Sequence, residues 1–374
     1  MFDLYNKYLI PVVIFNIITG GNQMDLQTLG WNDFFKETFF LYQEKGLHPG
    51  RVISRKNNNY VIICEEKLAL AKITGKFRYN TQTNKDFPTV GDWVALEMKK
   101  QSSHLLIHAV LPRENAFVRK SPISGGRKLK EGVVIGGKTE EQIIASNINT
   151  AFIVIGLDNN FEIRRIERYL TLVYHSNINP VIILNKLDLC FSLDDYIKQV
   201  KDIAGMVPVH PISAEKGMNM DVFSNYLLPG KTVVFLGSSG VGKSTITNYL
   251  LGDEKQKKQS ISKSTGKGRH TTTSVELILH HSNGMIIDTP GVRELQLWGD
   301  EEILDQSFED IKQLIYHCKF NNCHHQKEPG CAIQKAIEDN LLSRSRFESY
   351  QKQLFELQRL RTKRRDFEKK LNKK

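Results

Sequence analysis

The stretch KTVVFLGSSGVGKSTITNYLL, residues 231–251, decides the fold of the central part of the chain. Its apolar start predicts a strand and its end predicts a helix, so the G-x-x-x-x-G-K-[ST] motif between them is credible as a phosphate loop. In such a loop backbone N–H groups face the phosphates, Lys243 reaches the β and γ oxygens, and the Ser244 hydroxyl binds Mg²⁺. The residues expected to contact the nucleotide are Gly237, Ser238, Ser239, Gly240, Val241, Gly242, Lys243, Ser244 and Thr245.

A second motif, Asn185-Lys186-Leu187-Asp188, follows the apolar stretch PVIIL and indicates which base is bound. The Asp188 carboxylate can accept from guanine N1–H and N2–H₂ together, whereas adenine presents the opposite pattern at that edge. We expect Asn185 to orient the loop and contact the base, and Lys186 to cover the base with its stem. The turn Ser213-Ala214 is expected to donate a backbone N–H to guanine O6. This motif is weak alone, but together with the phosphate loop it predicts GTP or GDP as the ligand.

Two further segments have the character of GTPase switches. Asp288-Thr-Pro-Gly291 ends the apolar stretch MIID, and there Asp288 would hold Mg²⁺ through water while the Gly291 N–H senses the γ-phosphate. The polar segment 262–273 is expected to be a first switch, in which Thr271 or, by slight preference, Thr272 coordinates Mg²⁺. The alternative is a merely flexible basic loop.

The side chain that activates water is not obvious. Val292 follows Gly291 where many GTPases place a glutamine, which predicts slow intrinsic hydrolysis. His270 is the nearest candidate to position or deprotonate the attacking water. An equally weighted alternative is that His270 or Arg269 contacts RNA or phosphate instead.

The guanine motif precedes the phosphate loop, so the motifs run in circularly permuted order. Around them, apolar strands alternate with helical segments such as 163–174, which predicts an α/β domain with a mostly parallel sheet and helices on both faces. Strands are expected at 151–155, 180–184, 207–212, 231–236 and 284–287. We place this permuted P-loop GTPase domain at residues 143–299.

The N-terminal part is expected to be different in kind. Residues 1–46 would be an extension with a short helix between Trp31 and Glu44, and residues 47–118 a small β-barrel. The barrel strands are expected at 51–55, 60–66, 68–77, 92–99 and 105–112, between turn signals. An OB-type barrel is the leading interpretation, and an SH3-like barrel would give much the same pattern. Residues 119–142 are rich in Gly and Lys without helical or strand periodicity, which predicts a linker.

The C-terminal part, residues 300–374, shows helical patterns and one cysteine-rich loop. That loop offers three thiols and an imidazole, a set suited to one tetrahedral structural Zn²⁺: Cys318, Cys323, His325 and Cys331. His325 is preferred to His324 because a residue adjacent to Cys323 is poorly placed to turn toward the same metal. A reactive or redox cysteine cluster is the alternative.

The charge of the chain is concentrated near its end. The formal net charge is +11, and residues 341–374 carry 12 Lys/Arg against four acids. This excess points to a polyanionic partner, with a solvated helix face as the bland alternative. The five cysteines do not form a disulfide framework, so a reducing cytoplasm is expected. The only long apolar run, 8–18, is too short to span a bilayer, and no membrane partner is expected.

With the motif order NKLD, SAE, GSSGVGKS, GRHTTT, DTPG and then C-x₄-C-x-H-x₅-C, the chain resembles the ribosome small-subunit-dependent GTPase A family, RsgA. The resemblance also covers KTEEQIIASNINTAF, FEIRRIERYL and EPGCAI. It implies a GTP phosphohydrolase with an OB barrel, a permuted GTPase domain and a zinc domain that docks on the small ribosomal subunit and its rRNA during late maturation. It also implies subunit-stimulated hydrolysis coupled to release of another assembly factor. By the same likeness the family's catalytic histidine falls on His270.

Two other functions stay open. One is a GTP-gated rRNA-binding chaperone in which hydrolysis is incidental. The other is a zinc-module regulator of DNA, which is disfavoured because the Cys₃His loop lacks the helix and spacing of a groove-reading finger. We expect the protein to be a monomer.

Overall fold

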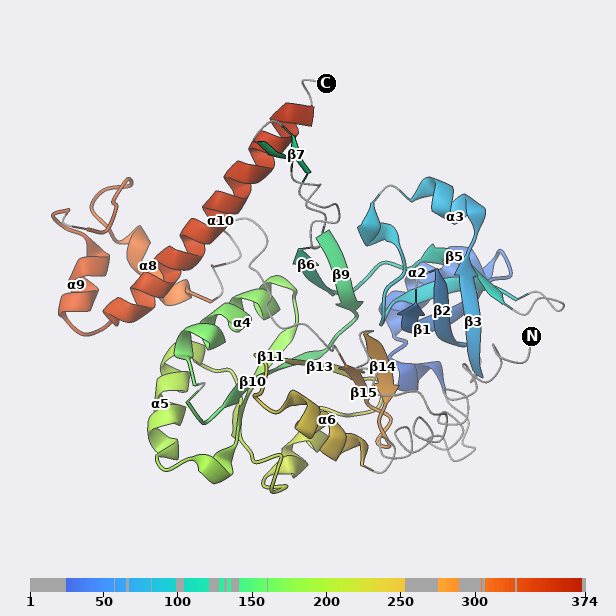
Figure 1. Ribbon diagram of the computed structural model, residues 1–374, viewed down its shortest axis with the longest axis horizontal. Coiled ribbons are helices and arrows are strands. Elements are labelled where there is room, and N and C mark those ends of the chain that lie inside the picture. Colours follow the sequence, from blue (N-terminus) through green and yellow to red (C-terminus); the bar gives the residue numbers. More distant parts are fainter. Residues whose placement is uncertain are drawn as a thin grey trace.

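In the computed structural model the chain forms a β-barrel, an α/β domain and a C-terminal helical module (Figure 1). The structure describes residues 25–374 except 57, 65–66, 82, 99–103, 121–127, 131–132, 136–140, 160, 253–274, 289–303, 305–306, 327 and 372–374. None of the helices described there is both long enough and apolar enough to cross a membrane.

Helix α2 (Asp33–Gln43) confirms the short helix expected before the barrel, and it follows a 3₁₀ turn, η1 (Leu26–Leu29). Its N-cap residue, Asn32, accepts at Oδ1 from the backbone N–H of Phe35 at 3.2 Å. This bond satisfies a donor that the helix itself leaves unpaired. The buried Phe35 ring lies 5.9 Å from Trp93 of the barrel, so α2 covers one side of that domain.

Five strands close into a barrel: β1 (His48–Lys56), β2 (Asn59–Cys64), β3 (Lys67–Ile73), β4 (Trp93–Glu97) and β5 (Leu105–Val110). Their order is β1-β2-β3-β5-β4, and β1 closes the barrel by pairing with β4. Neighbours are antiparallel except β3 and β5, which are parallel. This topology confirms the expected small barrel, which is closed and five-stranded. The inward side chains are Val52, Tyr60, Ile62, Ala71, Val94, Leu96 and Ile107.

One barrel strand is shorter than the sequence predicted. Strand β3 ends at Ile73, and helix α3 (Gly75–Asn80) occupies the rest of the segment 68–77. The Thr74 side chain accepts from the backbone N–H of Phe77 at 3.1 Å and starts the helix. A capping threonine therefore overrides the apolar pattern that suggested a continuous strand. A 3₁₀ turn, η2 (Asn84–Asp86), precedes β4.

The α/β domain contains a mostly parallel sheet in the order β12-β11-β10-β13-β15-β14. Its strands are β10 (Thr150–Gly156), β11 (Asn179–Asn185), β12 (Val209–Pro211), β13 (Thr232–Leu236), β14 (Glu276–Leu279) and β15 (Met285–Asp288). The chain enters at β10 near the centre, runs outward to β12 and then returns to β13, which lies against β10. The permuted motif order is therefore visible as a sheet whose first strand is central. Only β14, which the sequence patterns did not reveal, is antiparallel to its neighbour β15.

Helices cover both faces of this sheet, as expected. They are α4 (Ile163–His175), α5 (Leu193–Ala204) and α6 (Lys243–Leu251), with the 3₁₀ turns η3 (Leu187–Leu189) and η4 (Met220–Asn225). Every residue of β10 is buried, as in a central parallel strand. Its Ile153 packs in one core with Ile166 of α4, whereas Phe152 packs in another with Ile246 of α6.

The barrel and the α/β sheet are joined edge to edge. Ser54 of β1 pairs with Glu276 of β14, so one continuous sheet runs through both domains. Beside this seam lies the buried Arg51, whose guanidinium donates to the Asn147 carbonyl at 3.2 Å and to Thr232 Oγ1 at 2.9 Å. Burial lowers the pKa of Arg51 to about 10, against the attraction of nearby carboxylates. Its contacts span both domains and fix them to each other.

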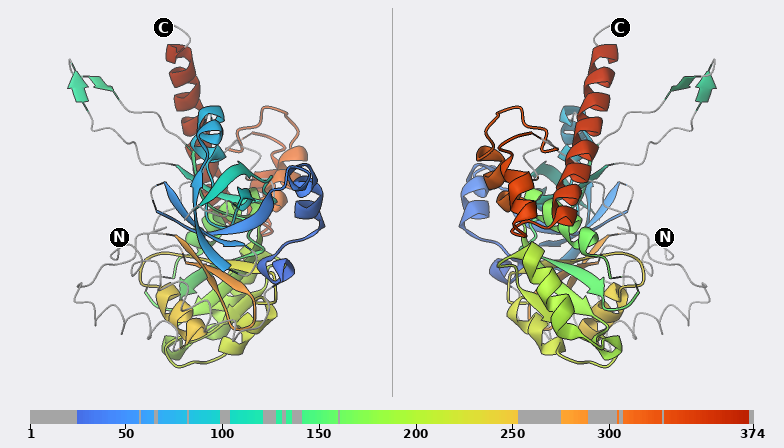
Figure 2. Two further views of the ribbon diagram at one scale, coloured as in Figure 1. Left: turned by 90° about the vertical axis from the view of Figure 1, so that its right-hand side faces the viewer. Right: turned by 90° about the vertical axis from the view of Figure 1, so that its left-hand side faces the viewer.

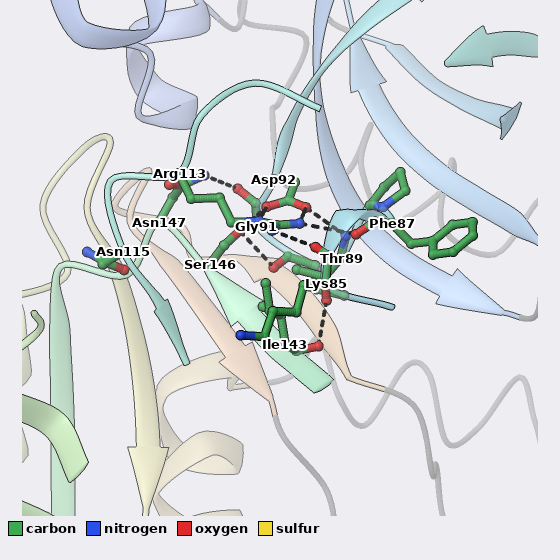
Figure 3. Close-up of polar contacts among 12 residues, drawn as sticks. Lys85, Phe87, Thr89, Gly91, Asp92, Arg113, Asn115, Ile143, Ser146 and Asn147 are labelled. Atoms are coloured by element: carbon green, nitrogen blue, oxygen red, sulfur yellow. Dashed lines mark hydrogen bonds and ion pairs between the residues drawn. The ribbon is translucent and has the colours of Figure 1, made fainter. Parts of the chain in front are cut away.

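A second polar network holds the segment that leaves the barrel (Figure 3). The Asp92 carboxylate is fully buried and accepts two hydrogen bonds of 2.7 Å from Arg113. It also accepts from Ser146 Oγ at 2.5 Å and from the backbone N–H of Thr89 at 2.8 Å. A Cβ on Gly91 would lie 2.2 Å from the Ser146 carbonyl oxygen, so only glycine permits this close approach. The paired and fully hydrogen-bonded carboxylate meets the conditions under which a buried charge is tolerated.

The segment expected to be an unstructured linker, 119–142, contains strands. Strand β6 (Ala116–Lys120) pairs with β9 (Glu141–Ser146), and β7 (Lys128–Lys130) pairs with β8 (Val133–Ile135). The sequence showed no strand periodicity here because β7 and β8 span only three residues each, too few for an alternating pattern to be read. The pair β7–β8 overlaps the last helix in Figure 1 but stands well away from it, outside the body of the protein, in Figure 2.

The C-terminal module is helical, as expected, with α8 (Glu309–Tyr316), α9 (Ala332–Glu338) and α10 (Arg344–Leu371). It docks on α4 of the α/β domain. Arg346 of α10 pairs with Glu167 at 3.1 Å and also binds Asp310 of α8 at 2.7 Å. Thr171 donates to Gln353 Oε1 at 3.2 Å, and both residues are buried. A polar seam therefore ties this module to the helix that follows β10.

Candidate functional site

The predicted nucleotide residues meet at the carboxyl edge of the parallel sheet. Strand β11 ends in Asn185, β13 leads into the phosphate loop, and β15 ends in Asp288. The chain runs outward in opposite directions from β10 and β13, and ligands bind at such a switch point in open α/β sheets. The topology thus brings three motifs together that are far apart in sequence.

The phosphate loop has the shape that its glycines allow. Gly237 has φ 147° and Gly242 has φ 101°, both in the region that other residues avoid. A Cβ on Gly237 would lie 2.4 Å from the Val154 carbonyl oxygen of β10, so the loop can pack this closely on the sheet only with glycine there. The Lys243 ammonium folds over the loop and donates to the carbonyl oxygens of Gly237 at 2.7 Å and Ser238 at 2.8 Å.

Asn185 connects the guanine motif to its neighbours. Its side chain is 3% exposed. Its Nδ2 donates to the Val241 carbonyl at 2.8 Å, and its Oδ1 accepts from the Ala214 backbone N–H at 3.0 Å. A Cβ on Gly242 would lie 2.1 Å from Nδ2, so the loop glycine makes this contact possible. The geometry supports the orienting role expected for Asn185, while its contact with the base stays a prediction.

Asp188 and Lys186 lie in the turn that directly follows β11. Asp188 is exposed, and one of its carboxylate oxygens accepts from the Ser213 hydroxyl, which in turn accepts from the Lys216 backbone N–H at 3.2 Å. Lys186 adopts the left-handed conformation, with φ 68°, and its Nζ lies 2.5 Å from Asp158 Oδ2. Leu187 opens the short turn η3 that carries the motif away from the sheet.

The expected donor to guanine O6 is already occupied. The Ser213 backbone N–H donates to the Met218 carbonyl at 3.1 Å, and the Ala214 N–H donates to Asn185 Oδ1. A bond from Ala214 to O6 would therefore have to be shared with Asn185. Sequence spacing does not reveal such competition, because it depends on where Asn185 points.

The magnesium residues are placed only in part. Ser244 lies at the start of α6, and Asp288 lies at the end of β15 on the same sheet edge. Hydroxyl and carboxylate oxygens are the ligands that Mg²⁺ prefers, so these two residues fit the ion. His270, Thr271, Thr272 and Gly291 lie outside the described residues.

Sequence reasoning missed two residues beside this site. Asp158 contacts Lys186 of the guanine motif, and Arg165 donates from Nη1 to Ser238 Oγ of the phosphate loop at 3.1 Å. Asp158 belongs to the connection from β10 to α4, which begins at the same carboxyl edge, and Arg165 lies in the first turn of α4. That position after a central strand is the one signal that would have drawn attention to them.

The four predicted zinc ligands converge. The ligand atoms of Cys318, Cys323, His325 and Cys331 all lie within 4.8 Å of one another. His325 Nδ1 is 3.5 Å from Cys318 Sγ and 3.6 Å from Cys331 Sγ. Tetrahedral Zn²⁺ with bonds of about 2.3 Å to sulfur and about 2.1 Å to nitrogen places such donor atoms about 3.6 Å apart. The residues present therefore fit the ion.

The surroundings of His325 hold its ring in place. Its φ is 59°, and its carbonyl accepts from Gln334 Nε2. The ring meets Phe347 edge to face at 5.8 Å, so the core of the C-terminal module supports it. Burial lowers the pKa of His325, which keeps the imidazole neutral and able to ligate. His324 instead donates its backbone N–H to Glu328, so the preference for His325 is consistent with the geometry.

Comparisons with known proteins place the chain in a family. The sequence model of the family described as RsgA GTPase matches residues 110–298. Small ribosomal subunit biogenesis GTPase RsgA of Opitutus terrae is 39% identical over 338 residues, 88% of this chain and 89% of that protein. RsgA 2 of Lactiplantibacillus plantarum, another small ribosomal subunit biogenesis GTPase, is 42% identical over 313 residues, 83% of this chain and 84% of that protein.

Two solved structures are similar in fold. The crystal structure of YjeQ from Thermotoga maritima has a TM-score of 0.60 and 26% identity, and the match covers 83% of this chain and 98% of that one. The crystal structure of YloQ, described as a circularly permuted GTPase, has a TM-score of 0.58 and 26% identity over 83% of this chain and 95% of that one.

Proposed function

The chain belongs to the RsgA GTPase family, and on this premise we propose that it hydrolyses GTP to GDP and phosphate while it acts in late maturation of the small ribosomal subunit. The observation that carries the proposal is the bond from Asn185 to Val241, which holds the guanine motif against the phosphate loop. A site that reads guanine at one end and binds phosphates at the other is what GTP requires.

The residues divide the work by position. Asp188 reads the guanine edge, Lys186 covers the base, and Lys243 turns from the loop carbonyls to the β and γ oxygens. Ser244 and Asp288 would hold Mg²⁺, which neutralises the charge that develops on the phosphates. Thr272 and Gly291 order the switches around the γ-phosphate, and His270 positions or deprotonates water. The remaining nucleotide contacts are Leu187, Ser213, Ala214, Gly237, Ser238, Ser239, Gly240, Val241, Gly242 and Thr245.

The C-terminal module is proposed to hold one structural Zn²⁺ through Cys318, Cys323, His325 and Cys331. With all four positions filled, the ion stabilises the loop between α8 and α9 rather than taking part in chemistry. The OB-type barrel and the basic end of α10 then face the rRNA, and hydrolysis is coupled to release from the subunit. The protein acts in the cytoplasm as a monomer, with another assembly factor as a partner.

Turnover of GTP with and without purified small subunits tests this function. We expect slow hydrolysis alone and a clear increase with subunits, because Val292 stands where a water-orienting glutamine is common. Lys243→Ala should abolish both, whereas Lys198→Ala, an exposed position on α5, should change neither. Equal turnover with and without subunits would contradict the proposal.

A GTP-gated rRNA-binding chaperone is the second candidate, and the same Val292 favours it because the usual catalytic glutamine is absent. The two candidates differ in what Lys243→Ala does to maturation. If hydrolysis is the function, cells that carry this variant accumulate immature small subunits. If hydrolysis is incidental and the variant still binds GTP, subunit binding and maturation stay intact.

A further inference from the structure

The connection from β10 to α4, together with the first turn of α4, touches both ends of the nucleotide site. In the connection, Asp158 Oδ2 pairs with Lys186 Nζ of the guanine motif across 2.5 Å. In the first turn of α4, Arg165 Nη1 donates to Ser238 Oγ of the phosphate loop across 3.1 Å. Neither Asp158 nor Arg165 belongs to a motif that binds nucleotide in the function proposed above. One short segment thus spans the distance between base and phosphates.

This connection is itself firmly held. The Leu157 backbone N–H donates to the Asn185 carbonyl at 2.8 Å, which fixes the start of the segment to β11. The Phe161 ring packs edge to face on Tyr196 of α5 at 4.6 Å. A segment anchored to two neighbouring elements can impose positions on the residues it contacts.

Asp158 restricts the rotamers of Lys186, a long side chain that is otherwise flexible. Lysine loses much rotamer entropy when it is fixed, and a site that fixes it before the ligand arrives avoids that cost on binding. The Asp158 and Lys186 side chains are 22% and 26% exposed, so the pair is shielded from most of the solvent. A Cβ on Gly156 would lie 2.9 Å from Asp158 Oδ1, so glycine leaves the carboxylate room to reach Lys186.

Arg165 acts on the turn of the phosphate loop that holds the catalytic lysine. The Ser238 hydroxyl accepts from Arg165, and the Ser238 carbonyl accepts from Lys243 at 2.8 Å. The guanidinium is held from its other side by Glu162 Oε2 at 2.8 Å. Ser238 is therefore fixed by one cation on its side chain and another on its backbone.

We propose that Asp158 and Arg165 are positioning residues for the guanine nucleotide, Asp158 for its base through Lys186 and Arg165 for its phosphates through Ser238. This rests on the proposed GTPase function. Asp158 sets the affinity for the guanine end, which GDP and GTP share. Arg165 sets the geometry of the phosphate loop, on which turnover depends.

Full-length variants test each end separately, with fluorescent GDP titration, competition by GTP and ATP, and steady-state hydrolysis on small subunits. Asp158→Asn should weaken GDP and GTP equally by about tenfold, as loss of one charge-assisted hydrogen bond does, and raise KM with kcat unchanged. Gly156→Ala should reproduce this result by displacing the carboxylate. Asp202→Asn, an exposed aspartate on α5, should behave as wild type.

Arg165→Ala should lower kcat about tenfold, and Arg165→Lys, which keeps one donor, should restore part of it. In a double-mutant cycle, Arg165→Ala combined with Ser238→Ala should be no worse than Arg165→Ala alone. Variants with reduced melting temperature but wild-type KM, kcat and affinity would overturn the proposal while leaving the GTPase function intact. A wild-type protein that binds no guanine nucleotide would instead overturn the GTPase function itself.

Discussion

Asn185 donates from Nδ2 to the Val241 carbonyl oxygen across 2.8 Å, and this bond joins the residue that ends β11 to the loop that follows β13. The same side chain accepts from the Ala214 N–H at 3.0 Å. Both partners are buried, so they have no easy access to water once the amide is removed.

Asn185→Ala should therefore weaken GDP binding. Each buried group left unpaired costs about 1–3 kcal/mol, which corresponds to a loss of about tenfold or more in affinity. Titration with fluorescent GDP measures the effect. Asn248→Ala, an exposed asparagine on α6, is the matched control and should bind as wild type. Wild-type affinity in Asn185→Ala would mean that the two loops hold their shapes independently.

The adjacent histidines 324 and 325 allow a direct test of the metal site. His325→Ala removes the imidazole that lies 3.5 Å from Cys318 Sγ, whereas His324→Ala removes a ring outside the cluster. We expect purified His325→Ala to lose most of its bound zinc and to melt at a lower temperature, because metal binding contributes directly to folding. His324→Ala should keep one zinc per chain by elemental analysis. Zinc retained by His325→Ala would exclude the Cys₃His assignment.

The docking of the C-terminal module should depend on one buried arginine. Arg346→Met removes one of two cations that pair with Glu167, which is 2% exposed, and leaves Arg164 3.3 Å away. Because breaking a buried pair completely costs about 3–5 kcal/mol, the loss should approach but not exceed this range. Arg168→Met is the control, because its partner Glu356 is 32% exposed and such pairs contribute about 0–1 kcal/mol. Urea unfolding and hydrogen exchange of α10 report the difference. The prediction fails if both variants lose the same stability.

Acid should destabilise the protein partly through His280. Burial lowers the pKa of His280 to about 4, and the neighbouring His281 adds to the effect. In the unfolded chain a histidine has a pKa of about 6.5. Between about pH 6.5 and about pH 4 His280 is therefore protonated in the unfolded chain and neutral in the folded protein. The contribution of His280 to the free energy of unfolding is complete above this pH range and is lost as the pH falls through it.

Thermal melts over this pH range test the effect. His280→Gln should show a shallower fall in melting temperature than wild type, whereas the exposed His281→Gln should keep most of the wild-type slope. Identical slopes in wild type and His280→Gln would assign the acid sensitivity to other groups.

The basic end of α10 should govern the salt dependence of subunit binding. Residues 358–374 contain nine Lys/Arg and two acids, and every cation that no longer neutralises a phosphate reduces the slope of log affinity against log salt by about 0.7 to 0.9. Deletion of 358–374 should flatten that slope, and deletion of 372–374, which removes two of the nine cations, should reduce it much less. An unchanged slope after the longer deletion would mean that this end of the helix faces solvent and contacts no phosphate.

Much of the architecture could be predicted because local sequence patterns determine it. Strand β10 is a continuous apolar run, α4 shows helical periodicity, and the phosphate loop has a motif with a known geometry. Strand β14 was missed because no motif marks it and it is defined by its pairing with β1 and β15. Short strands of this kind are stabilised by pairing with strands that are distant in sequence, so a local stretch of sequence does not predict them.

The buried charges were equally hidden. Arg51 and Asp92 look like ordinary surface residues in a strand and a turn, and only their tertiary partners make them core residues. Asp158 and Arg165 are hidden for the same reason, because what they contact is set by the fold. The metal ligands were predictable in contrast, since all four lie in one loop and their chemistry limits their arrangement.

The pairing of Ser54 with Glu276 has a consequence for folding during synthesis and for the expression of fragments. During synthesis the barrel emerges first, and the end of β1 has an open hydrogen-bonding edge until β14 has been translated. A fragment that ends after the barrel keeps this edge exposed for good, and a fragment that begins at β9 exposes the matching edge of β14. Such edges recruit strands from other molecules. Expression of either half alone is therefore expected to give aggregation-prone protein, although the second half contains all of the nucleotide and metal motifs.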